Sequence, residues 1–116
     1  MWWHLLLVLM LFTPVPAFGQ LQFYSGNDIY SWLDVEWRNR TLNEQEWHNL
    51  ALATGYVAGV ADLAGSGSLI CLPAQLDLGQ AKDVTLKYLR SRPEIRHRSA
   101  SDLVVEALQR TFPCRK

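Results

Sequence analysis

Apolar residues recur at helical spacing in four stretches of the chain, and no stretch alternates apolar and polar positions over a useful length. The first stretch begins near "SGNDIYSWL", where Asn27 is the expected N-cap. Ile29, Trp32 and Leu33 follow at the i, i+3, i+4 spacing of one buried face, and the pattern fades at "WRNR". A first amphipathic helix is therefore expected here.

The second stretch is the longest. Thr41 and Glu44 in "TLNE" have capping-box spacing, and the pattern continues to about Ala64, where "GSGS" is expected to end the helix. The large apolar residues of this helix form one stripe, which we expect to face the core: Leu52, Tyr56, Val60 and Leu63. A short extended piece, "LICLP", follows.

Two further helices complete the pattern. Asp77 is the expected N-cap of the third, with Gln80 three residues on, and Pro93 prevents its continuation. Its inward residues are expected to be Ala81, Val84, Tyr88 and Leu89. The fourth begins at "SASD", where Ser99 and Asp102 have capping spacing, and ends at "FPC". It is expected to bury Leu103, Val104, Ala107 and Leu108. The predicted fold class is all-α, a compact single-domain bundle of about four helices.

Two glycines, Gly55 and Gly59, lie inside the second helix in "GYVAGVAD". Each costs the helix about 1 kcal/mol relative to alanine. Together with Ala51 and Ala58 they form a strip almost without side chains. Another helix could approach this strip closely, and the dispersion contacts would offset the propensity cost. We expect close packing by an internal helix crossing; a strip reserved for a partner protein is the alternative.

The N-terminal segment "MWWHLLLVLMLFTPVPAFGQ" contains an apolar run, then prolines, then small residues that offer cleavage after Ala17 or Gly19. The run is shorter than the roughly 20 apolar residues of a membrane span. We interpret residues 1–19 as a secretory signal peptide and residues 20–116 as the exported domain, with no stable membrane insertion after cleavage. An uncleaved N-terminal anchor is the alternative.

Cys71 and Cys114 are the only cysteines of the chain. Exported domains fold in an oxidising compartment, so we expect a single structural disulfide between these two residues. It would close a loop of about 44 residues and stabilise the fold by about 4 kcal/mol in the chain-entropy model. That is a large share of the stability of a small domain. A nucleophilic cysteine is the less favoured interpretation of Cys71.

Charge and motifs exclude several classes of function. The chain has 11 basic and 11 acidic residues, and this formal neutrality argues against a nucleic-acid partner. The sequence lacks paired C-x-x-C and H-E-x-x-H motifs, and His48 and His97 have no carboxylate or thiol at a spacing typical of a site. We therefore expect no metal, no cofactor and no enzymatic activity.

The segment "RSRPEIRHRS", between the third and fourth helices, is the predicted partner-binding region. The residues concerned are Arg90, Arg92, Glu94, Arg96, His97 and Arg98. Arginines are enriched at interface hot spots, and loops carry binding more often than cores do. The alternative is a solvated turn in which one arginine, such as Arg96, pairs with an internal carboxylate such as Asp62.

Four aromatic residues lie near the expected helix ends: Phe23, Tyr24, Trp37 and Trp47. Residues of this kind are more often core-edge residues than binding anchors. The strip at Gly55 and Gly59 could also serve a symmetric contact, so the sequence leaves open a monomer or a homodimer.

Several strings, in their order and spacing, resemble the Rap/Tai family of type VI secretion amidase immunity proteins. The strings are "FYSGNDIYSWL", "GYVAGVAD", "ICLP", "VTLKYLRSRPEIRH" and "ASDLVVEALQRTFPC". The resemblance implies an exported helical immunity protein of the periplasm. Such a protein binds and occludes a peptidoglycan amidase effector, acts as an amidase inhibitor through protein–protein interaction, and has no catalysis of its own. The arginine-rich turn would then approach the enzyme's cleft.

The sequence departs from this family at one point. Its members commonly have a second cysteine pair, at the positions that Leu33 and Ala53 occupy here. An apolar contact can replace such a bridge in packing but not in loop closure, so the bond from Cys71 to Cys114 is expected to matter more. A periplasmic stress or chaperone-like helical binding module is the alternative function, ranked second because the chain carries few histidines to act as a pH trigger.

Overall fold

The computed structural model describes residues 22–38 and 41–115. Its elements are α1 (Gly26–Leu33), α2 (Val35–Arg38), α3 (Glu44–Ser66), α4 (Leu78–Ser91), the 3-10 turn η1 (Pro93–Ile95) and α5 (Ala100–Thr111). These residues form no strand, and the prediction of an all-α bundle is confirmed; α2 is a single turn that continues α1. None of the helices described here combines the length and the apolar character that crossing a membrane requires. The predicted signal peptide lies outside the described residues.

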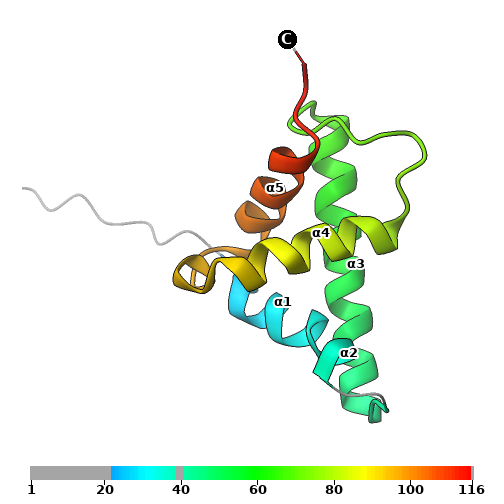
Figure 1. Ribbon diagram of the computed structural model, residues 1–116, viewed down its shortest axis with the longest axis vertical. Coiled ribbons are helices and arrows are strands. Elements are labelled where there is room, and N and C mark those ends of the chain that lie inside the picture. Colours follow the sequence, from blue (N-terminus) through cyan, green and yellow to red (C-terminus); the bar gives the residue numbers. More distant parts are fainter. Residues whose placement is uncertain (1–21, 39–40, 116) are drawn as a thin grey trace, which may run out of the picture.

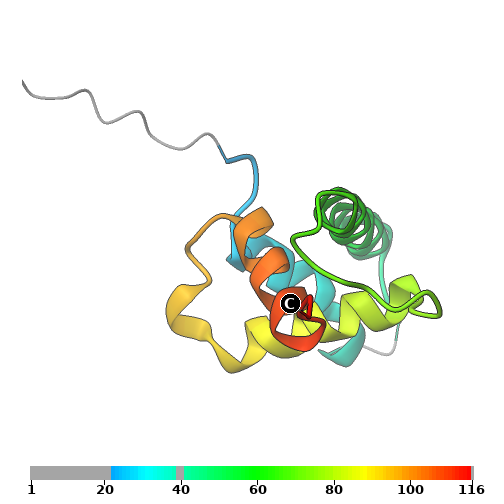
Figure 2. The same ribbon diagram turned by 90° about the horizontal axis from the view of Figure 1, so that it is seen from above.

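The helices pack around α3, the longest of them (Figure 1). α1 and α5 both contact α3, and α4 contacts all three. Figures 1 and 2 show α4 crossing the bundle, while the connection between α3 and α4 passes the C-terminal end of α5. This arrangement brings the residues around the two cysteines to one end of the molecule.

Side-chain caps fix where three of the helices begin. Asp77 caps α4 and forms a capping box with Gln80, as predicted. α1 is capped by Ser25 rather than Asn27, and α3 by Asn43 rather than Thr41. Three positions after each of these two caps, an acidic side chain accepts a hydrogen bond from the backbone N–H of the cap residue. The predicted caps lie two positions away, Asn27 after Ser25 and Thr41 before Asn43. Ser99 stands at the N-cap of α5, but its side chain makes no capping bond.

The stop signal "GSGS" ends α3 through a Schellman arrangement. The Leu69 N–H donates to the Ala64 carbonyl at 2.9 Å, and the Ser68 N–H donates to the Gly65 carbonyl at 3.2 Å. Ser68 takes the left-handed conformation with φ 60°, the position that glycine usually fills. The predicted extended piece "LICLP", residues 69–73, forms a bend followed by irregular structure, and no strand.

The predicted inward faces of α1 and α5 are largely correct. Ile29 and Leu33 of α1 are fully buried, and Trp32 is half-buried. In α5 the four predicted residues are all buried: Leu103, Val104, Ala107 and Leu108. In α4 the predicted pair Val84 and Tyr88 is only half-buried. The buried residues of that helix are Ala81, Thr85, Leu86 and Leu89.

The predicted inward stripe of α3 is wrong. Leu63 is 76% exposed, Leu52 is 37% exposed, and Tyr56 and Val60 are half-buried. The buried residues are Leu50, Ala53, Val57, Ala61 and Ala64. The helix has apolar residues on every side between Trp47 and Ala61, so periodicity cannot choose a face. The fold buries the face with alanines, which lets the other helices come close.

The internal helix crossing expected at Gly55 and Gly59 is also wrong. A Cβ atom built at either position meets no heavy atom within 4 Å. The glycine that permits a close approach is Gly26 at the start of α1. A Cβ there would overlap the Leu103 side chain and lie 2.8 Å from the Arg96 carbonyl oxygen. Close packing therefore joins α1 to α5 and to the turn before it.

The predicted disulfide between Cys71 and Cys114 is confirmed, with the two Cα atoms 4.9 Å apart. The Cys71 N–H also donates to the Phe112 carbonyl at 3.1 Å, and the Gln109 side-chain amide donates to the Leu69 carbonyl at 3.2 Å. Together these links tie the connection between α3 and α4 to the end of α5.

Candidate partner-binding surfaces

The structure gathers the six residues of the predicted partner-binding turn around η1. We call the segment 90–98 the arginine turn. Its backbone is pinned to α1, because the Gly26 N–H donates to the Arg98 carbonyl at 2.9 Å and the Asn27 N–H donates to the Arg96 carbonyl at 2.7 Å. These bonds satisfy N–H groups of the first turn of α1, which have no partner within the helix. The turn therefore has a structural role.

Arg90 pairs with a carboxylate from another part of the chain. Its Nη2 donates to Asp34 Oδ1 at 2.6 Å, and Arg38 Nε lies 3.3 Å from the other oxygen of the same carboxylate. Asp34 is only 8% exposed, so this is the internal carboxylate that the alternative interpretation required. The suggested pair of Arg96 with Asp62 does not form: Asp62 is exposed on α3. The Arg90 guanidinium also lies 5.2 Å from the Trp37 ring centroid.

Arg98 is held by Glu106 of α5. Its two terminal nitrogens donate to the carboxylate at 2.5 and 3.2 Å, and the Tyr88 hydroxyl donates to the same group at 2.9 Å. The hydrogen bond from Arg98 is the main reason that the pKa of Glu106 lies below its ordinary value. Burial, and then the bond to Glu106, raises the pKa of Tyr88.

The other residues of the turn differ in their surroundings. Arg92 Nε donates to Glu94 Oε1 at 2.9 Å. The Arg96 guanidinium stacks 3.8 Å from the Tyr30 ring centroid, and its buried Nε has no hydrogen-bond partner among the described residues. His97 is exposed. Each arginine of the turn thus has a carboxylate or an aromatic ring in contact with its guanidinium.

The four aromatic residues near the predicted helix ends fall into two groups. Phe23, Trp37 and Trp47 are 85%, 71% and 57% exposed, so none of them is a core residue. Tyr24 instead packs edge-on against Trp32 and Tyr56, with ring centroids 5.3 and 5.6 Å apart. It joins α1 to α3.

The strip at Gly55 and Gly59 is open to solvent on α3. Leu52 and Leu63 lie beside it and are exposed. A hollow of about 210 Å³ is lined by residues of this helix and of α5, among them Val60 and Val105. The strip remains a predicted contact surface for a partner.

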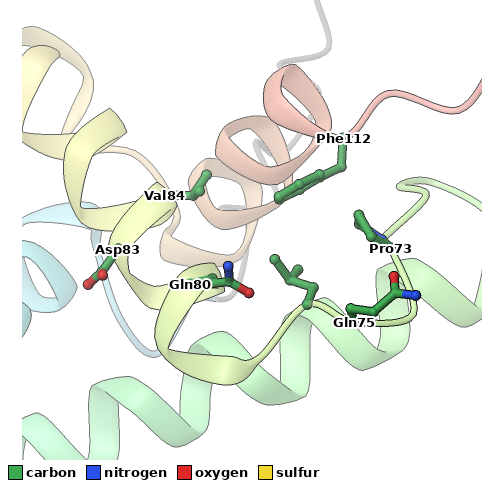
Figure 3. Close-up of a pocket in the computed structure, with 7 residues that line it drawn as sticks. Pro73, Gln75, Gln80, Asp83, Val84 and Phe112 are labelled. Atoms are coloured by element: carbon green, nitrogen blue, oxygen red, sulfur yellow. The ribbon is translucent and has the colours of Figure 1, made fainter.

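A larger hollow, which the sequence did not indicate, lies beside the disulfide. It has a volume of about 440 Å³. The residues that line it are Pro73, Gln75, Leu76, Gln80, Asp83, Val84 and Phe112 (Figure 3). Figure 3 shows the Phe112 ring reaching toward α4, with Pro73 and Gln75 across the opening from Val84.

A second hollow of about 300 Å³ adjoins it, since Val84 lines both. Its remaining lining residues are Lys87, Tyr88, Ser91, Ala107, Arg110 and Thr111. We call the two hollows together the α4–α5 groove. The sequence feature that could have pointed to this groove is the set of apolar residues beside each cysteine, in "CLPAQL" and "TFPC".

The described part of the chain, residues 22–38 and 41–115, holds no group of three or more His, Cys, Asp or Glu side chains placed to bind a metal ion. No titratable pair in these residues is arranged around the α4–α5 groove as a nucleophile and its base.

The sequence profile of the Rap1a immunity proteins matches residues 25–114. The chain belongs to the Rap1a immunity protein family. No curated protein is significantly similar to it. The matched range begins at the cap of α1 and ends at Cys114, so it includes every helix that the structure describes and both ends of the disulfide. The family resemblance seen in the sequence is confirmed, and membership in an immunity family implies an effector protein as partner.

In this Rap1a family member, apolar residues occupy the two positions at which the sequence comparison suggested a second cysteine pair. Leu33 and Ala53 are both fully buried in one hydrophobic cluster, on α1 and α3. The two helices contact one another, so apolar packing joins α1 to α3. The bond from Cys71 to Cys114 is the one disulfide of the described chain.

Proposed function

We propose that this protein is an exported immunity protein that binds a peptidoglycan amidase effector of type VI secretion in the periplasm. It occludes the enzyme's cleft by stoichiometric binding and carries out no catalysis of its own. Membership in the Rap1a immunity family is the observation that carries this proposal. The disulfide supports it, because such bonds persist in oxidising compartments.

The predicted signal peptide, residues 1–19, supplies export in this proposal. Expression of the full chain and N-terminal sequencing of the periplasmic protein would distinguish cleavage after Ala17 from cleavage after Gly19. A periplasmic protein that begins at Met1 would indicate an uncleaved anchor instead.

The arginine turn stays a predicted contact region. To bind a partner through its charges, Arg90 and Arg98 would have to leave Asp34 and Glu106. The exchange would break both ion pairs, and its cost is small because the arginine side chains are partly exposed. Contacts through the exposed His97 and through the outer edges of the guanidinium groups carry no such cost.

The test of the proposed function is direct. The amidase encoded beside this gene, identified by a catalytic cysteine and histidine, is expected to co-purify with the protein at equal stoichiometry and to lose activity on peptidoglycan in its presence. Sedimentation of the free protein would give one or two subunits. An active amidase in the presence of excess protein, with no complex, would refute the proposal. A low-pH change of oligomeric state with no amidase complex would instead favour the chaperone-like alternative.

A further inference from the structure

The α4–α5 groove combines an apolar half with a basic half. The first hollow has Leu76, Val84 and Phe112 as half-buried apolar lining. The second hollow has Lys87 and Arg110, both exposed, and no carboxylate among its lining residues. The two halves meet at Val84.

The hydroxyl groups that line the second hollow are already engaged. Tyr88 donates to Glu106, Ser91 donates to the Tyr88 carbonyl, and Thr111 donates to the Ala107 carbonyl. Lys87 and Arg110, by contrast, form no ion pair with any residue in the described part of the chain. The Arg110 guanidinium lies 5.5 Å from the Tyr88 ring centroid, and it is near enough to Glu106 to help lower the pKa of that carboxyl group without forming an ion pair with it. The unpaired donors of this hollow are therefore two cations.

The walls of the apolar hollow are fixed before any ligand arrives. Pro73, Gln75 and Leu76 belong to the connection that Cys71 ties to the end of α5. The bond from the Cys71 N–H to the Phe112 carbonyl sets the backbone that carries the Phe112 ring. Gln80 Oε1 accepts the Asp77 N–H at 3.0 Å, so that side chain is held as well. A pre-formed hollow loses little conformational freedom on binding.

On the basis of the proposed function, we propose that the α4–α5 groove is the docking site for a segment of the amidase effector. The segment places an aromatic or aliphatic side chain between Leu76 and Phe112, and a neighbouring carboxylate between Lys87 and Arg110. Charge complementarity selects an acidic segment, because the lining of the second hollow includes two cations that form no ion pair among the described residues, and it includes no carboxylate. The apolar side chain supplies affinity, as buried aromatic anchors do at other interfaces.

The test compares two pairs of charge reversals in the full-length protein purified from periplasm. K87E/R110E alters the groove, and R92E/H97E alters the arginine turn, which is the competing contact surface. The probe is the amidase from the neighbouring gene with its catalytic cysteine replaced by alanine, and calorimetry measures Kd. K87E/R110E is expected to weaken binding at least about 30-fold, and more than R92E/H97E does. The neutral pair K87Q/R110Q serves where the reversal fails to fold, and it is expected to weaken binding about 10-fold.

Leu76→Ala tests the apolar half separately and is expected to weaken binding at constant charge. Groove variants that bind as well as the wild type, with loss in R92E/H97E, would overturn the groove and leave the immunity function standing. A wild type that does not bind the amidase would overturn the proposed function and the groove together. A homodimer that K87E/R110E dissociates would assign the groove to a second copy of the chain, and so overturn the proposal.

Discussion

The arginine turn and the α4–α5 groove adjoin at the C-terminal end of α4, where Ser91 belongs to both, but they differ in how their charges are used. In the turn, Arg90, Arg92 and Arg98 each pair with a carboxylate. Two of those carboxylates, Asp34 and Glu106, come from outside the turn. In the groove, Lys87 and Arg110 line an open hollow and have no ion pair within the described residues.

This difference teaches that a run of like charges is poor evidence for an exposed charged surface. The fold supplies counter-ions to the turn from distant positions, and the turn in exchange supplies carbonyl groups to the first turn of α1. The groove takes its lining from the connection after α3, from α4 and from the end of α5, so no short stretch of sequence contains it.

Removal of the disulfide is expected to have the largest effect. The bond holds the connection that lines the groove, and it does not hold the arginine turn. Reduction, or the double variant C71S/C114S, is expected to lower the unfolding free energy by about 4 kcal/mol in the chain-entropy model. Hydrogen exchange at a temperature where the variant stays folded should show residues 67–77 losing protection while residues 93–99 keep it. An unchanged melting curve would contradict this, and so would equal loss of protection in both regions.

Two glycine substitutions are expected to have opposite signs. Gly26→Ala places a Cβ against Leu103 and the Arg96 carbonyl, and it should lower the unfolding free energy by about 1–3 kcal/mol. Gly59→Ala meets open space, and the gain in helix propensity should raise stability by about 1 kcal/mol. Chemical denaturation measures both. A destabilised Gly59→Ala would mean that this strip is packed in the folded protein, for instance within a homodimer.

The pair of Arg98 with Glu106 gives the smallest effect. The pKa of Glu106 is lowered in the fold, below the ordinary value of 4.5, so its contribution is present above the unfolded-state pKa. It is lost as the pH falls through the lowered folded-state pKa. The side chains are 39% and 34% exposed, so we expect less than about 1 kcal/mol. The stability difference between wild type and Glu106→Gln should shrink on acidification; a constant difference would show that the charge is not responsible.

The sequence predicted the elements better than their faces. Strong apolar periodicity in α5 identified four of its five buried residues, and proline and capping signals placed the limits of α4. In α3 the same reasoning selected Leu52 and Leu63, which are exposed, because the helix is apolar all round and local pattern carries no preference. The contacts of α1, α4 and α5 decide which face is buried.

The chain alone determined an all-α bundle, one disulfide and a family, since helix signals, a single pair of cysteines and the order of motifs are written along it. Tertiary structure decided which glycine lies in a close contact, which carboxylates neutralise the arginine turn, and where a groove is left open. Each of these depends on residues more than one helix apart, and their distance is set only when the helices pack.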